Sequence, residues 1–556
     1  MAETLRARGP DQGGVFVDPV NGAGLAARRL AITGHGQVGA QPMTDPAAGM
    51  TLVFNGEIYN HVALRQTLLA IEGEPFRGDS DTEVLLRALR RWGDGCLERI
   101  EGMVAFACWD AHREHMLLAR DRTGQKPLLW AQTPHGLVFA SDMRAIATSG
   151  WLTPRVRSQA IAEYLVMLAP PEPDSMFEDT YRLEAGTCLT LTRDGRRSAR
   201  RYWSAASLLH NPLETNANDL AAELGDRLGA AVATMIPSGQ RWAATLSGGI
   251  DSQLIAASVT DRVTPPSMIA TLGLSPPGAL DEAKGASAVA ARLEMSSCHQ
   301  LYRFTANELI EEHRILSALR LDAPVATCDS VLVSFLCARL QARDIRVCLF
   351  GDGADEIAGY PSHWRHADDP PRRFVQALYP EQAAALCRPS LARFAAGALA
   401  RLDAVAQPDL AGVARIVALE IGFRLPAFMA PRIDFASMAH GVELRCPFLH
   451  EPVMELLLRS PAALKIADGI PKAPLRILHQ RRFAHATPTK MGFGHPLAPF
   501  LAKWAAGRVG GAYSRVLPYL REDRLSAMVD DPRSDPFQLF VLYALEVWLE
   551  TVSRYQ

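Results

Sequence analysis

The sequence predicts two domains: an α+β layered domain, then an α/β domain with a parallel sheet and a helical C-terminal part. Three observations support this fold class. Short apolar runs separated by turn residues occupy residues 1 to about 200. From about residue 219, helical runs alternate with short apolar strands, as in a parallel sheet with crossover helices. From about residue 370 the chain is mostly helical and rich in Ala and Leu.

The first region, residues 1–203, is predicted to be rich in strands. Its apolar runs of strand length are separated by Gly, Asp and Asn turns, and they are Thr51–Phe54, Met116–Leu118, Leu128–Trp130, Leu137–Ala140 and Thr187–Leu191. Apolar residues recur at helical spacing over Asp81–Trp92 and predict a helix there. Strands with helices between them predict a layered α+β domain. Residues 204–218 contain Asn, Pro and Ser and are predicted to be the linker.

The second region, residues 219–556, begins with a predicted helix at Leu220–Met235. Three short apolar strands follow, at Trp242–Leu246, Ser267–Leu272 and Arg346–Phe350. Because helical runs separate these strands, we expect them to lie parallel in one sheet. Near the end of the chain, Phe537–Leu549 is apolar except for Glu546 and predicts a buried helix.

The composition is that of an ordinary soluble protein and narrows the range of partners. Of the 556 residues, 48% are hydrophobic and 21% are charged, and the net charge is -2. This balance gives no reason to expect nucleic acid or an anionic membrane as a partner. No apolar run approaches the ~18 residues of a membrane helix. The nine cysteines form no CxxC pair, which favours a reducing cytoplasm over a disulfide framework or a zinc ribbon.

The segment Leu246-Ser247-Gly248-Gly249-Ile250-Asp251-Ser252 has the features of a phosphate-binding turn. It follows an apolar strand and precedes a helical run, Gln253–Val259. Glycines allow a tight turn that brings backbone N–H groups against an anion, and the helix N-terminus adds positive dipole character. The two serines can donate hydroxyl groups. Asp251 can hold Mg²⁺, which binds carboxylate and phosphate oxygens together.

A second candidate segment, Gly351-Asp352-Gly353-Ala354-Asp355-Glu356, follows the strand at Arg346–Phe350. Open α/β sheets bind ligands at the carboxyl ends of their strands. Three acids crowded there would repel one another unless a cation neutralised them, and a Mg²⁺ shared with ATP would do so. Later in the chain, Lys472 lies in a Gly/Pro-rich turn before a helix. Its charge could stabilise an oxyanion or a phosphate.

Together these segments resemble the asparagine synthetase family, over nearly the whole chain and in the family's order. The turn at 246–252 resembles the PP-loop of ATP pyrophosphatases, which cleave ATP between its α and β phosphates. The resemblance implies that aspartate and Mg-ATP form β-aspartyl-AMP, which ammonia converts to asparagine. It also implies these roles: pyrophosphate binding by Ser247, Gly248, Gly249 and Ser252; magnesium binding by Asp251 and Asp355; nucleotide contacts by Leu246, Leu272, Phe350 and Gly351; and catalysis by Asp352 and Lys472.

The first region resembles a class II glutamine amidotransferase domain, an N-terminal-nucleophile αββα sandwich. The motifs that match are Arg8-Gly9-Pro10-Asp11, Arg29–Ile32, Asn55–Asn60, Gly78–Glu83 and Arg120–Leu128. In that family Arg29 would bind the α-carboxylate of glutamine, and Glu57 and Asp81 its amino group. Asn55 and the N–H of Gly56 would form the oxyanion hole.

The sequence departs from this pattern at the nucleophile. The family uses an N-terminal cysteine, whereas this chain begins Met1-Ala2-Glu3 and its nearest cysteine is Cys96. The first strand of the sandwich is missing with it. Either the cysteine lies upstream of this sequence, or the enzyme uses free ammonia or another amine. As the sequence is written, we expect no glutamine hydrolysis.

Smaller departures leave the acceptor open. Ala323 and His450 stand where the family usually has acidic residues. The alternatives are another carboxylate, from a secondary metabolite or a polysaccharide uronic acid, and a pseudoenzyme that binds nucleotide or glutamine without turnover. We expect small-molecule partners only (ATP, the acceptor, and glutamine or ammonia), with a homodimer left open.

Overall fold

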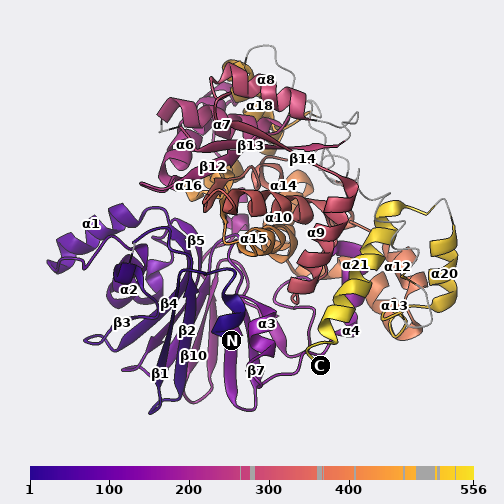
Figure 1. The fold of residues 1–556 in the computed structure, drawn as a ribbon, viewed down its shortest axis with the longest axis horizontal. Coiled ribbons are helices and arrows are strands. Elements are labelled where there is room, and N and C mark those ends of the chain that lie inside the picture. The colour runs from indigo at the N-terminus through magenta and orange to yellow at the C-terminus, as the bar shows by residue number, and fades with distance from the viewer. Residues whose placement is uncertain are drawn as a thin grey trace.

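The computed structural model describes residues 1–34, 36–262, 265–275, 282–359, 366, 368–405, 409–467, 470–483, 508–509, 514–531 and 534–556. Two sheet-based domains pack against each other, with the strands of the first at the lower left of Figure 1 and the second sheet above them. One apolar core runs across the boundary, because Ile32 and Tyr59 of the first domain belong to the same cluster as Leu246 and Phe448 of the second.

The first domain is built from antiparallel strands. Its largest sheet has the order β11-β10-β6-β5-β4-β3 and smaller sheets have the orders β8-β7-β9 and β1-β2. The strands are β1 (Gln12–Asp18), β2 (Ala23–Arg29), β3 (Met43–Asp45), β4 (Met50–Ile58), β5 (Gly102–Asp110), β6 (His115–Arg120), β7 (Leu129–Thr133), β8 (Gly136–Ala140), β9 (Thr180–Arg182), β10 (Thr187–Thr192) and β11 (Arg197–Arg201).

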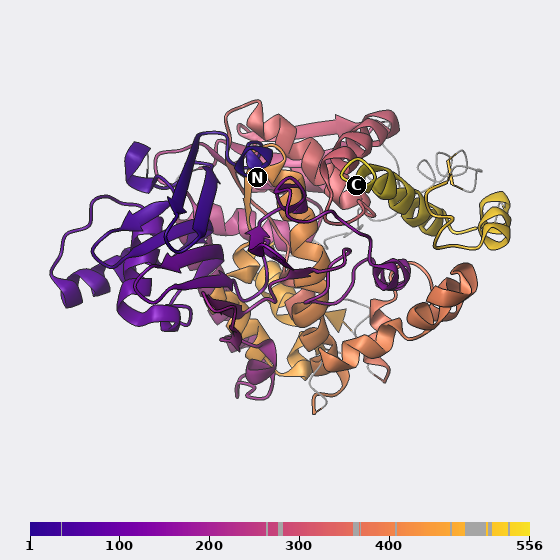
Figure 2. The ribbon, with the colours of Figure 1, turned by 90° about the horizontal axis from the view of Figure 1, so that it is seen from below.

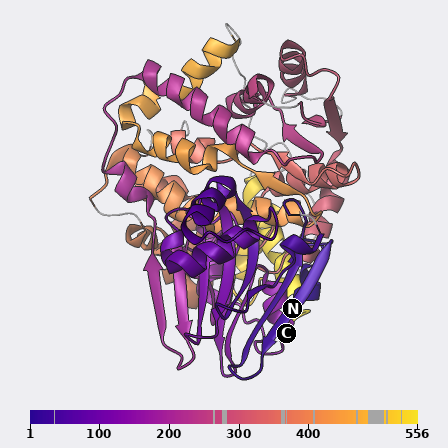
Figure 3. The same cartoon turned by 90° about the vertical axis from the view of Figure 1, so that its left-hand side faces the viewer.

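Helices α1 (His61–Glu72) and α2 (Asp81–Trp92) cover one face of the large sheet, as Figure 3 shows. The predicted helix at Asp81–Trp92 is confirmed with both of its ends. The hydroxyl of Ser80 caps it by accepting from the N–H of Thr82, and Asp81 lies in its first turn. The apolar face of α2 packs on β4 and β5, which places Asp81 against β4. Two further helices, α3 (Met143–Ala147) and α4 (Ser158–Met167), follow the small sheet.

The second domain contains the predicted parallel sheet, with the order β14-β13-β12-β15-β16. Its strands are β12 (Trp242–Thr245), β13 (Met268–Leu274), β14 (His299–Phe304), β15 (Val347–Leu349) and β16 (Glu443–Arg445). The helices around it are α6 (Ala217–Met235), α7 (Ile250–Arg262), α8 (Ala283–Arg292), α9 (Ala306–Leu319), α10 (Cys328–Gln341), α11 (Ala354–Ala358), α15 (Ala430–Met438), α16 (Glu451–Arg459) and α18 (Ala473–Phe483). Because β13 and β15 flank β12, the loops that follow these three strands meet at one edge.

The helical part that completes the chain projects to the right in Figure 2. Its helices are α12 (Pro380–Leu386), α13 (Pro389–Ala396), α20 (Glu522–Asp530) and α21 (Pro536–Val552). Helix α14 (Gly412–Leu419) lies instead near the centre of Figure 1. The predicted buried helix at Phe537–Leu549 is α21, whose Glu546 is held by the hydroxyl of Ser514 at 2.7 Å. Among the described residues, no helix is both long and apolar enough to cross a membrane.

The structure differs from the prediction in one connection. The predicted linker, residues 204–218, contains the short helix α5 (Ala205–Leu209), whose N-terminus is capped by Ser204. Its Ala205 and Ala206 are buried in apolar clusters, so this segment packs onto the second domain. Tertiary packing has overridden a composition that is typical of a loop.

Candidate functional site

The turn between β12 and α7 has the form of an anion-binding site. The hydroxyls of Ser247 and Ser252 lie 2.9 Å apart and tie the two ends of the turn together. The N–H of Gly249 donates to Ser247 Oγ at 3.1 Å. The N–H of Gly248 donates to a carboxylate oxygen of Glu282 at 3.0 Å. The backbone N–H of Gly248, beside the N-terminus of α7, therefore already binds a carboxylate. A phosphate group would bind to backbone N–H groups in the same way.

Lys472 joins the two predicted magnesium ligands. Its ammonium group lies 2.7 Å from both carboxylate oxygens of Asp251 and 2.7 Å from one oxygen of Asp355. The lysine is 5% exposed and comes from the connection between β18 (Ile470–Pro471) and α18. Its backbone φ of 60° is unusual for a residue with a side chain and directs Lys472 into this cluster. Three segments separated by more than 100 residues thus converge on one point.

The donor set at this point fits a hard cation. Two carboxylates converge on one positive group, so a cation can be shared between Asp251 and Asp355. Within the part of the chain that the structure describes, no group of three or more His, Cys, Asp or Glu side chains could hold a metal by itself. Mg²⁺ commonly takes only one or two carboxylates and completes its shell with water and phosphate oxygens. The pair therefore suits Mg²⁺ that arrives with ATP.

The predicted nucleotide contacts lie around the same edge of the sheet. Leu246 directly follows β12, Leu272 lies on the neighbouring β13, and Phe350 and Gly351 follow β15 on the other side. A methyl group at Gly351 would lie 3.5 Å from Cβ of Asp251, so the backbone after β15 passes directly beside the turn. The sheet topology brings these residues together as predicted.

Asp352 occupies a partly buried position beside two other charged side chains. Burial is the main cause that raises its pKa to about 7, and the nearby Arg432 opposes the shift. Oδ2 of Asp352 has no hydrogen-bond partner among the described residues, and Arg432 lies 3.9 Å from it. Arg432 also forms an ion pair with Asp329 of α10. Asp352 can therefore exchange a proton near neutral pH at the rim of the site.

The five predicted glutamine-binding residues line one cavity of about 770 Å³ in the first domain. They are Arg29, Asn55, Gly56, Glu57 and Asp81. Gly56 has a φ of 147°, and a methyl group there would lie 1.9 Å from the carbonyl oxygen of Met103, so only glycine fits.

The polar groups of this cavity already have partners within the chain. Arg29 donates to the side chain of Gln12 at 2.8 Å and to the carbonyl of Gly34 at 2.6 Å. Burial and then the neighbouring Glu57 raise the pKa of Asp81 well above its ordinary value. Two carboxylates thus lie together in a position where a bound ammonium group would relieve their repulsion.

No cysteine lines this cavity. Cys96, the first cysteine in the sequence, is fully buried in a separate core, where burial raises the pKa of its thiol. The cavity continues between β2 and β8, which among the described strands pair only with β1 and β7 respectively.

Sequence reasoning missed two residues at the nucleotide edge. Glu282 precedes α8 and contacts the turn through Gly248, but it lies outside every motif that we recognised. Arg432 lies in the first turn of α15 and also belongs to no motif that we recognised. An acid or an arginine at a helix start is common in any sequence, so only the structure shows that these two face the site.

Comparison with known proteins divides the chain in the same way. A family model described as a glutamine amidotransferase domain matches residues 1–203, and one described as asparagine synthase matches residues 223–550. A Mycobacterium tuberculosis protein (strain H37Rv), named "Putative asparagine synthetase [glutamine-hydrolyzing]", is 31% identical over 91% of this chain and 86% of its own. Asparagine synthetase [glutamine-hydrolyzing] 1 of Bacillus subtilis (strain 168) is 25% identical over 96% of this chain and 90% of its own.

Proposed function

Because the chain belongs to the asparagine synthase family, we propose that it is an ATP-dependent amide ligase that makes asparagine from aspartate. A carboxylate oxygen of aspartate attacks the α-phosphorus of Mg-ATP, the bond to the bridging oxygen breaks, and pyrophosphate leaves. Ammonia then attacks the acyl carbon of β-aspartyl-AMP. The bond from that carbon to the phosphate oxygen breaks, AMP leaves with the electron pair, and the amide nitrogen loses a proton.

The observation that carries this proposal is the convergence of Lys472, Asp251 and Asp355 beside the turn at 246–252. The turn offers backbone N–H groups to the leaving pyrophosphate. Magnesium, when bound with ATP, neutralises phosphate charge. Lys472 is long enough to turn from the carboxylates toward the α-phosphate or the tetrahedral oxyanion, where its charge lowers the barrier.

Asp352 is the residue that we assign to proton transfer. A carboxyl group with a pKa of about 7 is present in both protonation states at neutral pH, which suits it to accept a proton from the attacking nitrogen. Arg432 holds the carboxylate without forming a close hydrogen bond to it. In this proposal Lys472 stabilises negative charge in the transition state, and Asp352 accepts the proton from the attacking nitrogen.

The direct test is product analysis. The purified chain is incubated with aspartate, ammonium and Mg-ATP, and nucleotides are separated by anion exchange. We expect AMP, pyrophosphate and asparagine in equal amounts, and none from an Asp251→Ala variant. Release of ADP and inorganic phosphate would show that ATP is cleaved at the other bond and would contradict the proposal.

A second acceptor remains a candidate because Asp329 pairs with Arg432, the arginine that faces Asp352. A diacid such as aspartate would compete with this internal carboxylate for the guanidinium group. An acceptor with a single carboxylate would not. A screen of carboxylates by pyrophosphate release separates the two, since only the true acceptor gives release above background. Binding of ATP without turnover of any carboxylate would favour a pseudoenzyme.

A further inference from the structure

Arg445 reaches from the second domain into the cavity of the first. It lies on β16 of the parallel sheet, yet its guanidinium donates to a carboxylate oxygen of Glu57 at 2.9 Å. The side chain is 2% exposed and also donates to the carbonyl of Met235 at 2.8 Å. Glu443, next but one on the same strand, lines the cavity itself. The first-domain cavity is therefore completed by the second domain.

The contact between Arg445 and Glu57 is one of a series of buried ion pairs whose members come from both domains. We call it the ion row, and it consists of Glu57, Arg445, Glu443, Lys126, Asp434 and Arg8. Its further contacts are Arg445 to Glu443 at 2.9 Å, Glu443 to Lys126 at 3.4 Å, Lys126 to Asp434 at 3.3 Å and Arg8 to Asp434 at 2.6 Å. A charged ligand that binds at Glu57 changes the electrostatic energy of the other members of the ion row. The buried surroundings exclude water and therefore screen these charges only weakly.

The same elements touch the nucleotide edge of the sheet. The backbone carbonyl of Arg445 accepts from the N–H of Phe350 at 2.9 Å, immediately before Gly351 and Asp352. Asp434 of the ion row lies on α15, two residues after Arg432, which faces Asp352. Two short paths, one through β16 and one through α15, therefore lead from Glu57 to Asp352.

We propose that Arg445 is a positioning residue of the amino-acid subsite and couples occupation of that subsite to nucleotide binding. The inference rests on the proposed function for the nucleotide site, and on the role that the family resemblance implies for Glu57, which is to bind the α-amino group of glutamine. An incoming ammonium group competes with Arg445 for the Glu57 carboxylate. Arg445 then bonds more closely to Glu443 and Met235, which shifts β16 against β15. Coupling of this kind needs binding only, not hydrolysis.

The experiment measures a coupling factor by titration calorimetry with the whole chain. The dissociation constant of Mg-ATP is determined with and without saturating glutamine, and that of glutamine with and without Mg-ATP, in the absence of acceptor. We expect both ratios to be equal and at least about fivefold in the wild type, since coupling is reciprocal. In Arg445→Met both ligands should bind with a ratio near one, and Arg445→Lys should restore part of it.

Two further variants guard against a general loss of structure. Arg87 forms a buried pair with Glu72 at 2.7 Å within the first domain and lies outside the cavity, so Arg87→Met is the matched control and should keep the wild-type ratio. Glu443→Gln keeps the shape of the ion row and should reduce the ratio even if Arg445→Met fails to fold.

The possible failures can be told apart. If both ligands bind to the wild type with a ratio of one, the coupling is refuted and the proposed ligase function stands. If glutamine does not bind at all, the assignment of Glu57 falls and the coupling with it, while product analysis still decides the adenylation chemistry. A Glu443→Gln variant with the full wild-type ratio would also overturn the role of the ion row.

Discussion

Removal of the Lys472 ammonium group should destabilise the second domain and make its stability depend on Mg²⁺. In Lys472→Met the side chain keeps its approximate volume but loses its charge. Asp251 and Asp355, whose side chains are 11% and 18% exposed, would then lose the ammonium group that contacts both of them. Each contact at 2.7 Å contributes roughly 6 kcal/mol of attraction at an effective dielectric constant of about 20.

The net effect is smaller than this attraction, because burial of the lysine itself costs desolvation free energy. Breaking a buried pair by removing one partner typically costs about 3–5 kcal/mol, and we expect a loss of this size in EDTA. Binding of Mg²⁺ to the carboxylates of Asp251 and Asp355 restores stability by mass action. At 100 times its dissociation constant it returns about 2.7 kcal/mol.

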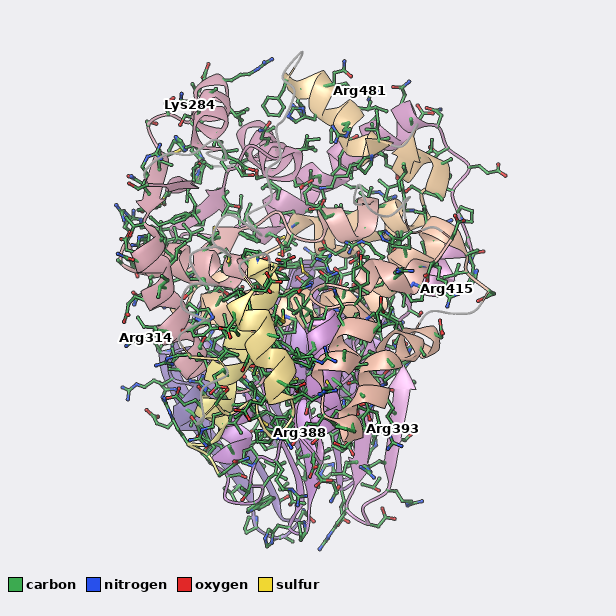
Figure 4. The ribbon with its side chains drawn as sticks, turned by 90° about the vertical axis from the view of Figure 1, so that its right-hand side faces the viewer. Lys284, Arg314, Arg388, Arg393, Arg415 and Arg481 are labelled. Atoms are coloured by element: carbon green, nitrogen blue, oxygen red, sulfur yellow. The ribbon has the colours of Figure 1, made fainter. Side chains whose placement is uncertain are left out.

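The assay is urea unfolding followed by tryptophan fluorescence, to which Trp242 on β12 contributes, with and without Mg²⁺. The matched control is Lys465→Met. Lys465 is also buried, but among the described residues the partners of its ammonium group are the carbonyls of Leu458 and Ser460, at 3.1 Å and 2.5 Å. The Lys465→Met variant should be less stable than the wild type, and Mg²⁺ should not restore its stability. Lys284, exposed at the top of Figure 4, provides a surface control.

The reasoning would be refuted if Lys472→Met were as stable as the wild type in EDTA. It would equally fail if Mg²⁺ stabilised Lys465→Met to the same extent, since the effect would then be unrelated to the two aspartates.

Three other outcomes follow from the site. Because the pKa of Asp352 is raised from 3.8 to about 7, its charged form opposes folding, so stability should fall as pH rises from about 4 to 7. Asp352→Asn should remove that slope and add ~2 kcal/mol at pH 8, below the limit of about 4 kcal/mol because the side chain is 22% exposed, while asparagine formation from ammonia drops at least about 100-fold. Asp355→Asn should weaken Mg-ATP binding in calorimetry and leave glutamine affinity unchanged, and equal losses of both would contradict a local role. The 556-residue chain should form no glutamate from glutamine in a coupled dehydrogenase assay; turnover would show that another group replaces the cysteine.

Much of the fold could be predicted because the strands of the second domain are short, apolar and followed by recognisable turns. The strand at Trp242–Leu246 and its turn were predicted together, and parallel pairing with β13 and β15 then brings distant loops to one edge. In the first domain, β1 and β2 were not predicted individually, since Gly, Ala and Arg dominate their sequences. β5 is buried along its whole length and shows no alternation of polar and apolar residues.

The candidate site was predictable where a side chain and its turn lie in one motif, and not where the partner comes from elsewhere. The pairing of Asp251 with Asp355 was expected from the resemblance to the asparagine synthetase family, but the position of Lys472 between them was not. The role of Arg445 depends on a contact with Glu57, 388 residues away. Local pattern carries no information about such a contact.

Burial of the charged groups of the ion row costs desolvation free energy, which indicates a role other than stabilisation of the fold. Apolar residues of similar volume would join the two domains at least as firmly, because burial of charged groups loses more hydration than the pairs regain in many proteins. The interface already contains such residues, since Tyr59 and Phe448 share one apolar core. Charges placed between two ligand sites, however, respond to a charged ligand at either end, which apolar packing cannot do. The row therefore makes sense as a means of transmitting occupancy, and an apolar replacement of Arg445 with its partners should leave a stable but uncoupled protein.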